Sequence, residues 1–219
     1  MDSVNQSNEL NEKLKLDQTL RSLKRNGFKA FYFSTRKKAL SKILTLIPQN
    51  VIVGFGGSVT LREMGLPQIL EVRGNQVADH WKAIERGASV EEIEEIRRMH
   101  INSDVFITST NAITENGELI NIDGVGQRVA AMIFGPKKVI VVAGLNKIVR
   151  NIDEAIYRAR NTAAVMNAKR SKLKTPCTVT GECSDCDSIA RICNVTTIMH
   201  RKPRMTDITI VLINEKLGY

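Results

Sequence analysis

The sequence predicts an α/β fold with a mainly parallel sheet, flanking helices and a mixed or antiparallel hairpin portion. Short runs rich in valine and isoleucine, such as VIVGF at 51–55 and VIVVAG at 139–144, are typical of buried strands. Helix-period segments separate these runs, which favours strand–helix–strand units. The pair Asn116-Gly117 lies between two strand-like runs and predicts one antiparallel hairpin.

The N-terminal segment, residues 1–26, is predicted to be an amphipathic helix. Its leucines recur at roughly helical spacing among charged residues: Leu10, Leu14, Leu20 and Leu23. The pair Asn26-Gly27 predicts the end of this helix. The run KAFYFS, 29–34, is then expected to form the first strand.

Helices and strands alternate through the rest of the first half. A helix at 35–46 places its apolar residues on one face and precedes the buried strand at 51–55. The next helix begins near Ser58 or Thr60. Ser89 and Glu92 form a capping box that opens a helix. Its core-facing residues are predicted to be Val90, Ile93, Ile96 and Met99. The run at 104–113 is expected to be one strand.

The second half continues the alternation after the Asn-Gly turn. A returning strand, ELINI, leads into a helix over QRVAAMIF and then into the buried strand at 139–144. A helix at 153–169 has Ile156, Ala159, Ala163 and Met166 inward, and 207–214 is the last strand. Residues 171–205 are predicted to be irregular and hold every cysteine. We therefore expect one α/β domain over residues 1–219.

The composition is that of a globular protein: 219 residues, 42% hydrophobic and 25% charged. No apolar run reaches the ~18–20 residues of a membrane span. The N-terminus has no apolar signal-peptide core, so we expect a cytoplasmic protein. The net charge is +9, but no aromatic residue lies from 161 to 216 to stack on bases. We therefore prefer a small anion or an acidic protein partner over nucleic acid.

Two glycine loops are the first candidates for a ligand site. Gly56, Gly57 and Ser58 follow a strand, and Asp123-Gly124-Val125-Gly126 follows another, each before a helix. Such junctions present backbone N–H groups to anions, and open parallel sheets bind ligands at the carboxyl ends of their strands. Both are also explained as tight turns, with Asp123 as a helix cap. The first loop departs from the dinucleotide pattern at Val59, and no P-loop is present.

Further polar residues follow the predicted strands. Arg128 lies in the first turn of the helix after the second loop, where its guanidinium can reach an anion. Asn146 and Lys147 follow the strand at 139–144. The motif TENG, 114–117, has two interpretations. The favoured one is a plain Asn-Gly turn with a solvent-exposed Glu115, and the alternative is that Glu115 is a catalytic nucleophile or base. The histidines are read as surface or capping residues, with His80 beside Asp79 as the outlier.

All four cysteines lie in the irregular region, as Cys177, Cys183, Cys186 and Cys193. Their spacing, C-x5-C-x2-C-x6-C, matches neither the usual zinc finger nor the ferredoxin pattern. Four clustered thiolates suit zinc or an iron–sulfur cluster, and we prefer such a site. The alternative is a loop of unligated or redox-active thiols.

Three blocks carry a resemblance to a known family. VGFGGSVTLREMG, TSTNAITENGELINIDGVGQRVAAMIFGPKKVIVVAGLNKIV and TPCTVTGECSDCDSIARICN resemble the lactate-utilisation (LUD) domain family. The likeness is closest to its short cysteine-containing members from anaerobic bacteria. It implies a fold similar to the sugar-phosphate isomerase, glucosamine-phosphate deaminase and coenzyme A transferase group. In those enzymes glycine loops surround the ligand, which implies one cleft lined by Gly56, Gly57, Ser58, Gly124, Gly126, Arg128, Asn146 and Lys147.

The resemblance leaves three functions open. The first is a subunit or accessory protein in oxidation of lactate or a related 2-hydroxy acid, acting with iron–sulfur partner proteins. The second is a stand-alone acyl-CoA transferase or sugar-phosphate isomerase-like enzyme, because TENG resembles the turn that bears the catalytic glutamate of some coenzyme A transferases. The third is a non-enzymatic module that senses metal or redox state. A homo-oligomer is compatible with each.

Overall fold

A computed structural model describes residues 2–219, with side chains described from residue 13 onward. Its larger sheet has six strands in the order β1-β10-β7-β4-β2-β3. Every neighbouring pair in this sheet is parallel. The predicted fold class is therefore confirmed. The strands are β1 (Lys29–Phe33), β2 (Ile52–Phe55), β3 (Gln76–Ala78), β4 (Val105–Thr108), β7 (Lys138–Gly144) and β10 (Asp207–Ile213).

The smaller sheet is mixed and has the order β8-β5-β6-β9. Its strands are β5 (Ala112–Thr114), β6 (Leu119–Asp123), β8 (Ile148–Val149) and β9 (Val195–Met199). β5 and β6 form the predicted antiparallel hairpin around Asn116-Gly117, while β8 joins β5 in parallel. The expectation of one strand at 104–113 is wrong, because β4 belongs to the larger sheet and β5 to the smaller one. Between them, the Thr110 hydroxyl donates to the carbonyls of Ala112 and Ile120.

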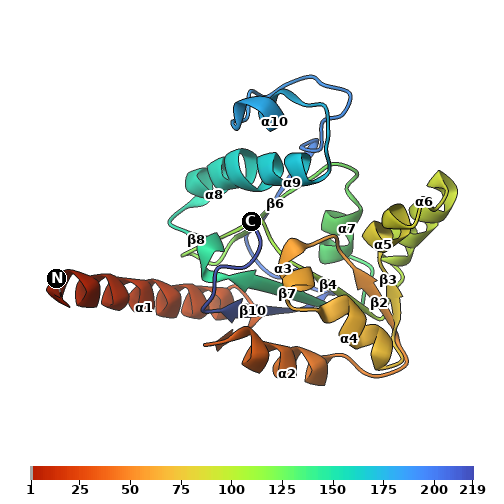
Figure 1. The fold of residues 1–219 in the computed structure, drawn as a ribbon. Helices are drawn as coiled ribbons and strands as arrows, with labels where there is room; N and C mark the ends of the chain where they lie inside the picture. The colour runs from red at the N-terminus through yellow and green to blue at the C-terminus, as the bar shows by residue number, and fades with distance from the viewer. Residues whose placement is uncertain (1) are drawn as a thin grey trace.

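Helices cover both faces of the larger sheet. They are α1 (Asp2–Arg25), α2 (Arg36–Leu46), α3 (Val59–Glu63), α4 (Leu66–Val72), α5 (His80–Glu85), α6 (Val90–Met99), α7 (Gln127–Ile133), α8 (Ile152–Arg158), α9 (Val165–Arg170) and α10 (Pro176–Thr180). A π-helical segment, Ala159–Ala164, joins α8 to α9, and a 3-10 turn, Leu145–Lys147, follows β7. In Figure 1, α2 and α4 lie below the larger sheet. On its other face, Leu23 of α1 and Met132 of α7 share a buried cluster with β7. α8 lies further up and packs on the smaller sheet.

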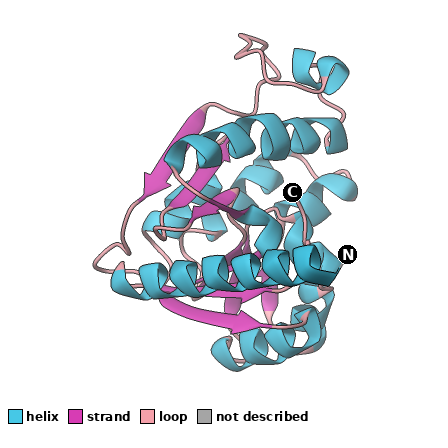
Figure 2. Cartoon of the chain, turned by 90° about the vertical axis from the view of Figure 1, so that its left-hand side faces the viewer, coloured by secondary structure: helices cyan, strands magenta, loops and turns pink. Residues whose placement is uncertain are grey.

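The core explains why the apolar runs are continuous. Along β7, Val139 and Val141 join a buried cluster with leucines of α1 and residues of the β5–β6 hairpin. The alternate residues Ile140 and Val142 join the cluster under α2, α3 and α4. Side chains of a strand alternate between faces, so a strand covered on both faces must be apolar throughout. Figure 2 shows α1 lying along the molecule beside the larger sheet.

The region 171–205 is only partly irregular, contrary to expectation. It contains α10 and the strand β9, which pairs with β6 in an antiparallel register that aligns Val195 with Asp123. The segment 181–194 between them has no helix or strand and carries three of the cysteines. None of the described helices combines the length and hydropathy that a membrane span needs.

Candidate functional site

Three strands of the larger sheet end at one cavity. β2, β4 and β7 are parallel, so their carboxyl ends meet at the same edge of the sheet. A cavity of about 80 Å³, here called the inner cavity, is lined there by residues 57–60 after β2, by residues 109–111 after β4 and by Lys147 after β7. Gly57, Ser58 and Lys147 are among the ligand residues that the sequence predicts.

A second cavity of about 410 Å³, here called the outer cavity, adjoins the first. Five residues line both cavities: Gly57, Trp81, Arg128, Asn167 and Ile192. The outer cavity is also lined by His80, Arg97 and Gln127. One buried polar atom in each, Nδ1, Nε and Oε1 respectively, has no hydrogen-bond partner among the described residues. Buried polar groups ordinarily have partners, so this wall is suited to a polar ligand.

Lys147 is the most unusual side chain of the inner cavity. It is only 2% exposed, and its Nζ lies 3.0 Å from Thr60 Oγ1 and 2.9 Å from Ser109 Oγ. Among the described residues no carboxylate pairs with it within 4 Å. Burial, with a further contribution from the positive charges of Arg158 and Arg128, lowers the pKa of Lys147 to about 7, although Glu63 opposes the shift.

The two hydroxyls act as acceptors toward Lys147. Thr60 Oγ1 donates its own hydrogen to the carbonyl of Leu217 at 3.2 Å, and Ser109 Oγ donates to that of Thr110 at 3.5 Å. Each hydroxyl therefore presents a lone pair to Nζ. A neutral amine has two N–H groups, and these two contacts use both. The third position on Nζ has no protein partner among the described residues.

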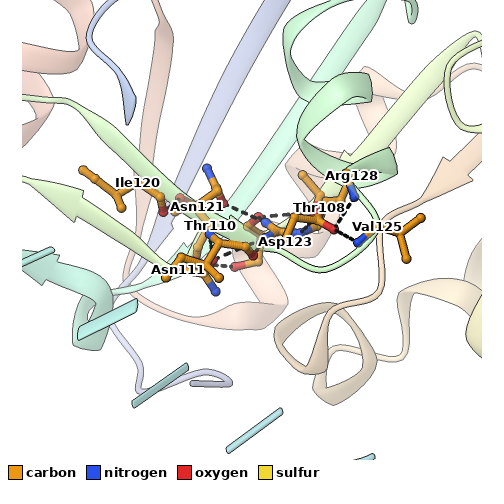
Figure 3. Close-up of polar contacts among 11 residues, drawn as sticks. Thr108, Thr110, Asn111, Ile120, Asn121, Asp123, Val125 and Arg128 are labelled. Atoms are coloured by element: carbon orange, nitrogen blue, oxygen red, sulfur yellow. Dashed lines mark hydrogen bonds and ion pairs between the residues drawn. The ribbon is translucent and has the colours of Figure 1, made fainter. Parts of the chain in front are cut away.

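Arg128 is held by the protein on every side (Figure 3). Its five N–H groups meet Ser109 O, Asn121 Oδ1, Asn111 Oδ1, Ile122 O and Asp123 Oδ2. The other oxygen of Asp123 accepts from the backbone N–H groups of Val125 and Gly126 at 3.2 and 2.9 Å. Arg128 thus contributes positive charge to the cavity wall while its donors fix the second glycine loop to the smaller sheet.

The structure brings most of the predicted ligand residues together. Gly57, Ser58, Arg128 and Lys147 line the inner cavity, and Asp123 and Gly124 line the outer one with Gly57. The two glycine loops therefore face a shared space. Gly57 is needed because a Cβ there would lie 2.3 Å from Trp81 Nε1.

Three predicted residues line neither cavity: Gly56, Gly126 and Asn146. A Cβ on Gly56 would meet Thr108 Oγ1 at 2.7 Å, so packing requires glycine there. Gly126 caps α7 with a φ of 95°, a left-handed conformation that suits glycine. Asn146 donates to Gly218 O and accepts from Leu217 N, so it anchors the last residues of the chain.

Glu115 lies away from both cavities. It occupies the β5–β6 turn, where its carboxylate pairs with Lys15 at 3.4 Å and its backbone N–H donates to Val149 O. Neither cavity includes it among its lining residues. The predicted nucleophile or base is therefore not part of the inner or outer cavity, and its catalytic role stays a prediction.

The cysteines all carry free, half-buried thiols. Burial raises the pKa of Cys193, and the neighbouring charges of Cys183 and Cys186 raise it further, so these three thiols are near one another. Cys177 lies on α10, where its sulfur contacts Thr175 Oγ1 at 3.2 Å. In the described part of the chain, no group of three or more His, Cys, Asp or Glu side chains is arranged to hold a metal. As arranged, the loop does not fit a four-thiolate site, and the shared metal or cluster stays a prediction.

Three residues that complete the site did not stand out in the sequence: Trp81, Asn167 and Tyr219. Trp81 is the single tryptophan, and the guanidinium of Arg170 lies 3.6 Å from the centre of its ring. Asn167 Oδ1 accepts from Arg170 and from the Tyr219 hydroxyl at 3.2 Å. This arrangement leaves Nδ2 of Asn167 as a donor beside both cavities.

His80 is buried and uncharged. It is 4% exposed, and burial together with nearby His100 and arginines lowers its pKa to about 3. The neighbouring Asp79 makes no hydrogen bond to the imidazole of His80. That carboxylate accepts from the backbone N–H groups of Trp81 and Lys82 and pairs with Arg62 at 2.7 Å. Asp79 therefore starts α5 and positions Trp81 at the cavities.

Comparison with known proteins identifies a family and a similar solved structure. The family model of the LUD domain matches residues 16–213 of this chain. The solved structure of a DUF162 family protein from Deinococcus radiodurans is similar, with a TM-score of 0.51 over 92% of this chain and 98% of that one. Sequence identity is 12%, so this likeness shows the fold alone. A search of curated protein sequences finds no match.

Proposed function

Because this chain belongs to the LUD domain family, we propose that it acts in the metabolism of lactate or a related 2-hydroxy acid, with the small carboxylate bound in the inner cavity. The observation that carries this proposal is Lys147, a buried amine without a carboxylate partner among the described residues. An uncompensated amine in a polar cavity favours an anion that supplies the missing charge.

The charges around the inner cavity support an anionic ligand. No aspartate or glutamate is among its lining residues, whereas Arg128 and Lys147 both are. Arg158 stands behind the cavity and donates to the carbonyls of Asn146 and Asn111. Half-buried there, Arg158 adds positive charge beside Lys147. The volume of about 80 Å³ suits a small acid, with the outer cavity as the adjoining space.

Electron transfer requires a further component. Oxidation of a 2-hydroxy acid needs an acceptor for two electrons, which side chains alone do not provide. The sequence carries no complete flavin or nicotinamide fingerprint, since Val59 interrupts the pattern in the first glycine loop and Val129 in the second. We therefore propose that iron–sulfur partner proteins accept the electrons. We propose that exposed cations, among them Lys169 and Lys172, contact an acidic partner.

Titration calorimetry with lactate and pyruvate tests the proposal. Lys147→Met should weaken binding of either acid roughly 10- to 150-fold, because charge-assisted hydrogen bonds contribute about 1.5–3 kcal/mol. The matched control is Lys174→Met, which removes an exposed charge and should leave binding within about twofold. Binding that is equal in the wild type and Lys147→Met, or that is absent for both acids in the wild type, contradicts the proposal.

A further inference from the structure

We infer that Lys147 forms a covalent imine with the carbonyl carbon of a 2-oxo acid held in the inner cavity. The inference rests on the proposed function and deepens it, since it assigns the lysine a chemical step and narrows the ligand to an acid with a carbonyl beside the carboxylate. Lysine amines are the usual protein nucleophiles toward carbonyl groups.

The contacts of Nζ leave it able to react. Its two protein partners are the hydroxyl oxygens of Thr60 and Ser109, and both hydroxyls donate elsewhere, to Leu217 O and Thr110 O. The neutral amine therefore uses its two N–H groups on these oxygens and keeps its lone pair uncommitted. Because Lys147 lines the inner cavity, a carbonyl carbon can approach that lone pair.

The surroundings also keep the amine partly neutral. The side chain is 2% exposed, two arginines stand near it, and no described carboxylate pairs with it. Desolvation and neighbouring cations are the two effects that activate lysine nucleophiles. With a pKa of about 7, roughly half of the amines are unprotonated at neutral pH.

Other lining residues of the inner cavity suit the carboxylate of the ligand. Asn167 lines both cavities, and the contacts of its Oδ1 with Arg170 and Tyr219 leave Nδ2 to donate. Trp81 Nε1 lies against Gly57, which also lines this cavity. The inferred pose binds the carboxylate to these donors and puts the adjacent carbonyl carbon beside Lys147 in the same cavity.

The reaction balances without an oxidant. The Nζ lone pair forms a bond to the carbonyl carbon, the carbonyl oxygen takes up a proton, and the amine loses one. A second proton on that oxygen lets it leave as water, and nitrogen and carbon form the double bond. The amine supplies the first of these protons and solvent water the second, while the Thr60 and Ser109 hydroxyls, whose own hydrogens go to Leu217 O and Thr110 O, hold Nζ in place. The protonated imine stays cationic beside the carboxylate.

Reductive trapping tests this step on the full chain. Pyruvate and sodium cyanoborohydride should add one pyruvic acid less one oxygen atom to the protein, and peptide mapping should place the added mass on Lys147. Lactate has no carbonyl and should give no adduct. Lys147→Arg keeps a cation but has no reactive amine and should lose the adduct, whereas Lys174→Arg should be trapped like the wild type.

Peptide mapping of the trapped wild-type protein identifies the modified lysine directly. The test therefore remains valid even if Lys147→Arg does not fold. Pyruvate that binds by calorimetry but leaves Lys147 unmodified, or that modifies exposed lysines equally, overturns the imine while the proposed function stands. If neither acid binds, the proposed function fails with it. Trapping at Lys147 above all other lysines supports the inference.

Discussion

At the residue scale, the site depends on two buried cations, Arg128 and Lys147, which differ in how many of their donors the protein uses. Arg128 gives all five N–H groups to the protein, whereas Lys147 leaves one position of Nζ without a described partner. The sequence predicts both as ligand residues, because each follows a strand end. Pattern alone could not separate them, since the partners of Arg128 come from segments up to 19 residues away.

The pKa of Lys147 predicts a pH-dependent cost of folding. Its folded-state pKa of about 7 lies below its ordinary 10.5, so the unfolded chain binds more protons between these values. The free energy of unfolding therefore rises with pH across that window. The cost is fully present below pH 7 and is lost as the pH approaches 10.5.

Lys147→Met should accordingly raise the melting temperature most at pH 6, with a smaller gain at pH 10. Each kcal/mol corresponds to about 2–4 °C in a domain of this size. Thermal unfolding followed by circular dichroism at the two pH values checks this, with Lys174→Met as the control that should show no such trend. A gain that is equal at both pH values is inconsistent with a lysine buried as described.

Arg128→Lys should destabilise the fold. A lysine presents its donors at one point and cannot span the acceptors of Asn111, Asn121 and Asp123. Each buried acceptor left without a partner costs about 1–3 kcal/mol, so we expect a loss of about 2–4 kcal/mol in urea unfolding. The exposed Arg204→Lys should change stability by less than about 0.5 kcal/mol. Equal stability of the two variants would show that the network around Arg128 is unimportant.

At the element scale, the π-helical segment explains why the sequence missed Asn167. An α-helical period over 153–169 turns Met166 inward with Ala159 and Ala163. The two alanines are buried, but Met166 is 46% exposed and Val165 and Ala168 are buried instead. The wider turn at Ala159–Ala164 rotates the following face of the helix, which puts Asn167 at the cavities.

The predicted core face of α6 is wrong for another reason. Val90 is 67% exposed, and no residue of α6 is fully buried.

Asn167→Asp should impair binding of carboxylates without unfolding the protein. An aspartate keeps an oxygen that accepts from Arg170 and Tyr219, but it replaces the free donor by a negative charge facing the ligand. We expect the Kd of pyruvate to rise at least 10-fold, more than for Asn167→Ala, with little change in melting temperature. If Asn167→Asp raises the Kd of pyruvate less than Asn167→Ala does, the carboxylate of the ligand does not bind at Asn167.

The cysteine segment is the second element with a chemical prediction. Four thiolates around zinc lie roughly 4 Å apart, so binding of one metal would require the segment 181–194 to change shape. Ile192 of this segment packs on Gly124 and lines both cavities, so such a change would also reshape the site. We expect anaerobically prepared protein to contain metal, and Cys183→Ser with Cys186→Ser to lose it. Metal-free anaerobic protein would leave the four cysteines as ordinary thiols.

At the scale of the whole molecule, the site is assembled from distant parts of the chain. The parallel sheet brings three strand ends to one edge, and their apolar runs made this predictable. The surrounding walls come from other parts of the chain. Trp81 belongs to α5, Asn167 to α9, Ile192 to the cysteine segment and Tyr219 to the last residues. These contacts depend on tertiary packing rather than on local pattern. The likeness to the LUD domain, by contrast, was already visible in three blocks of sequence and is confirmed.

The central claim is that an uncompensated amine, Lys147, faces a small carboxylate in the inner cavity. Nuclear magnetic resonance of protein with carbon-13 at the lysine ε position measures this directly, and Lys147→Arg assigns the resonance. We predict that Lys147 titrates near pH 7, and that lactate, which forms no imine, raises this pKa because its carboxylate favours the charged amine. A resonance that titrates near 10.5, or that does not respond to lactate, would contradict the account.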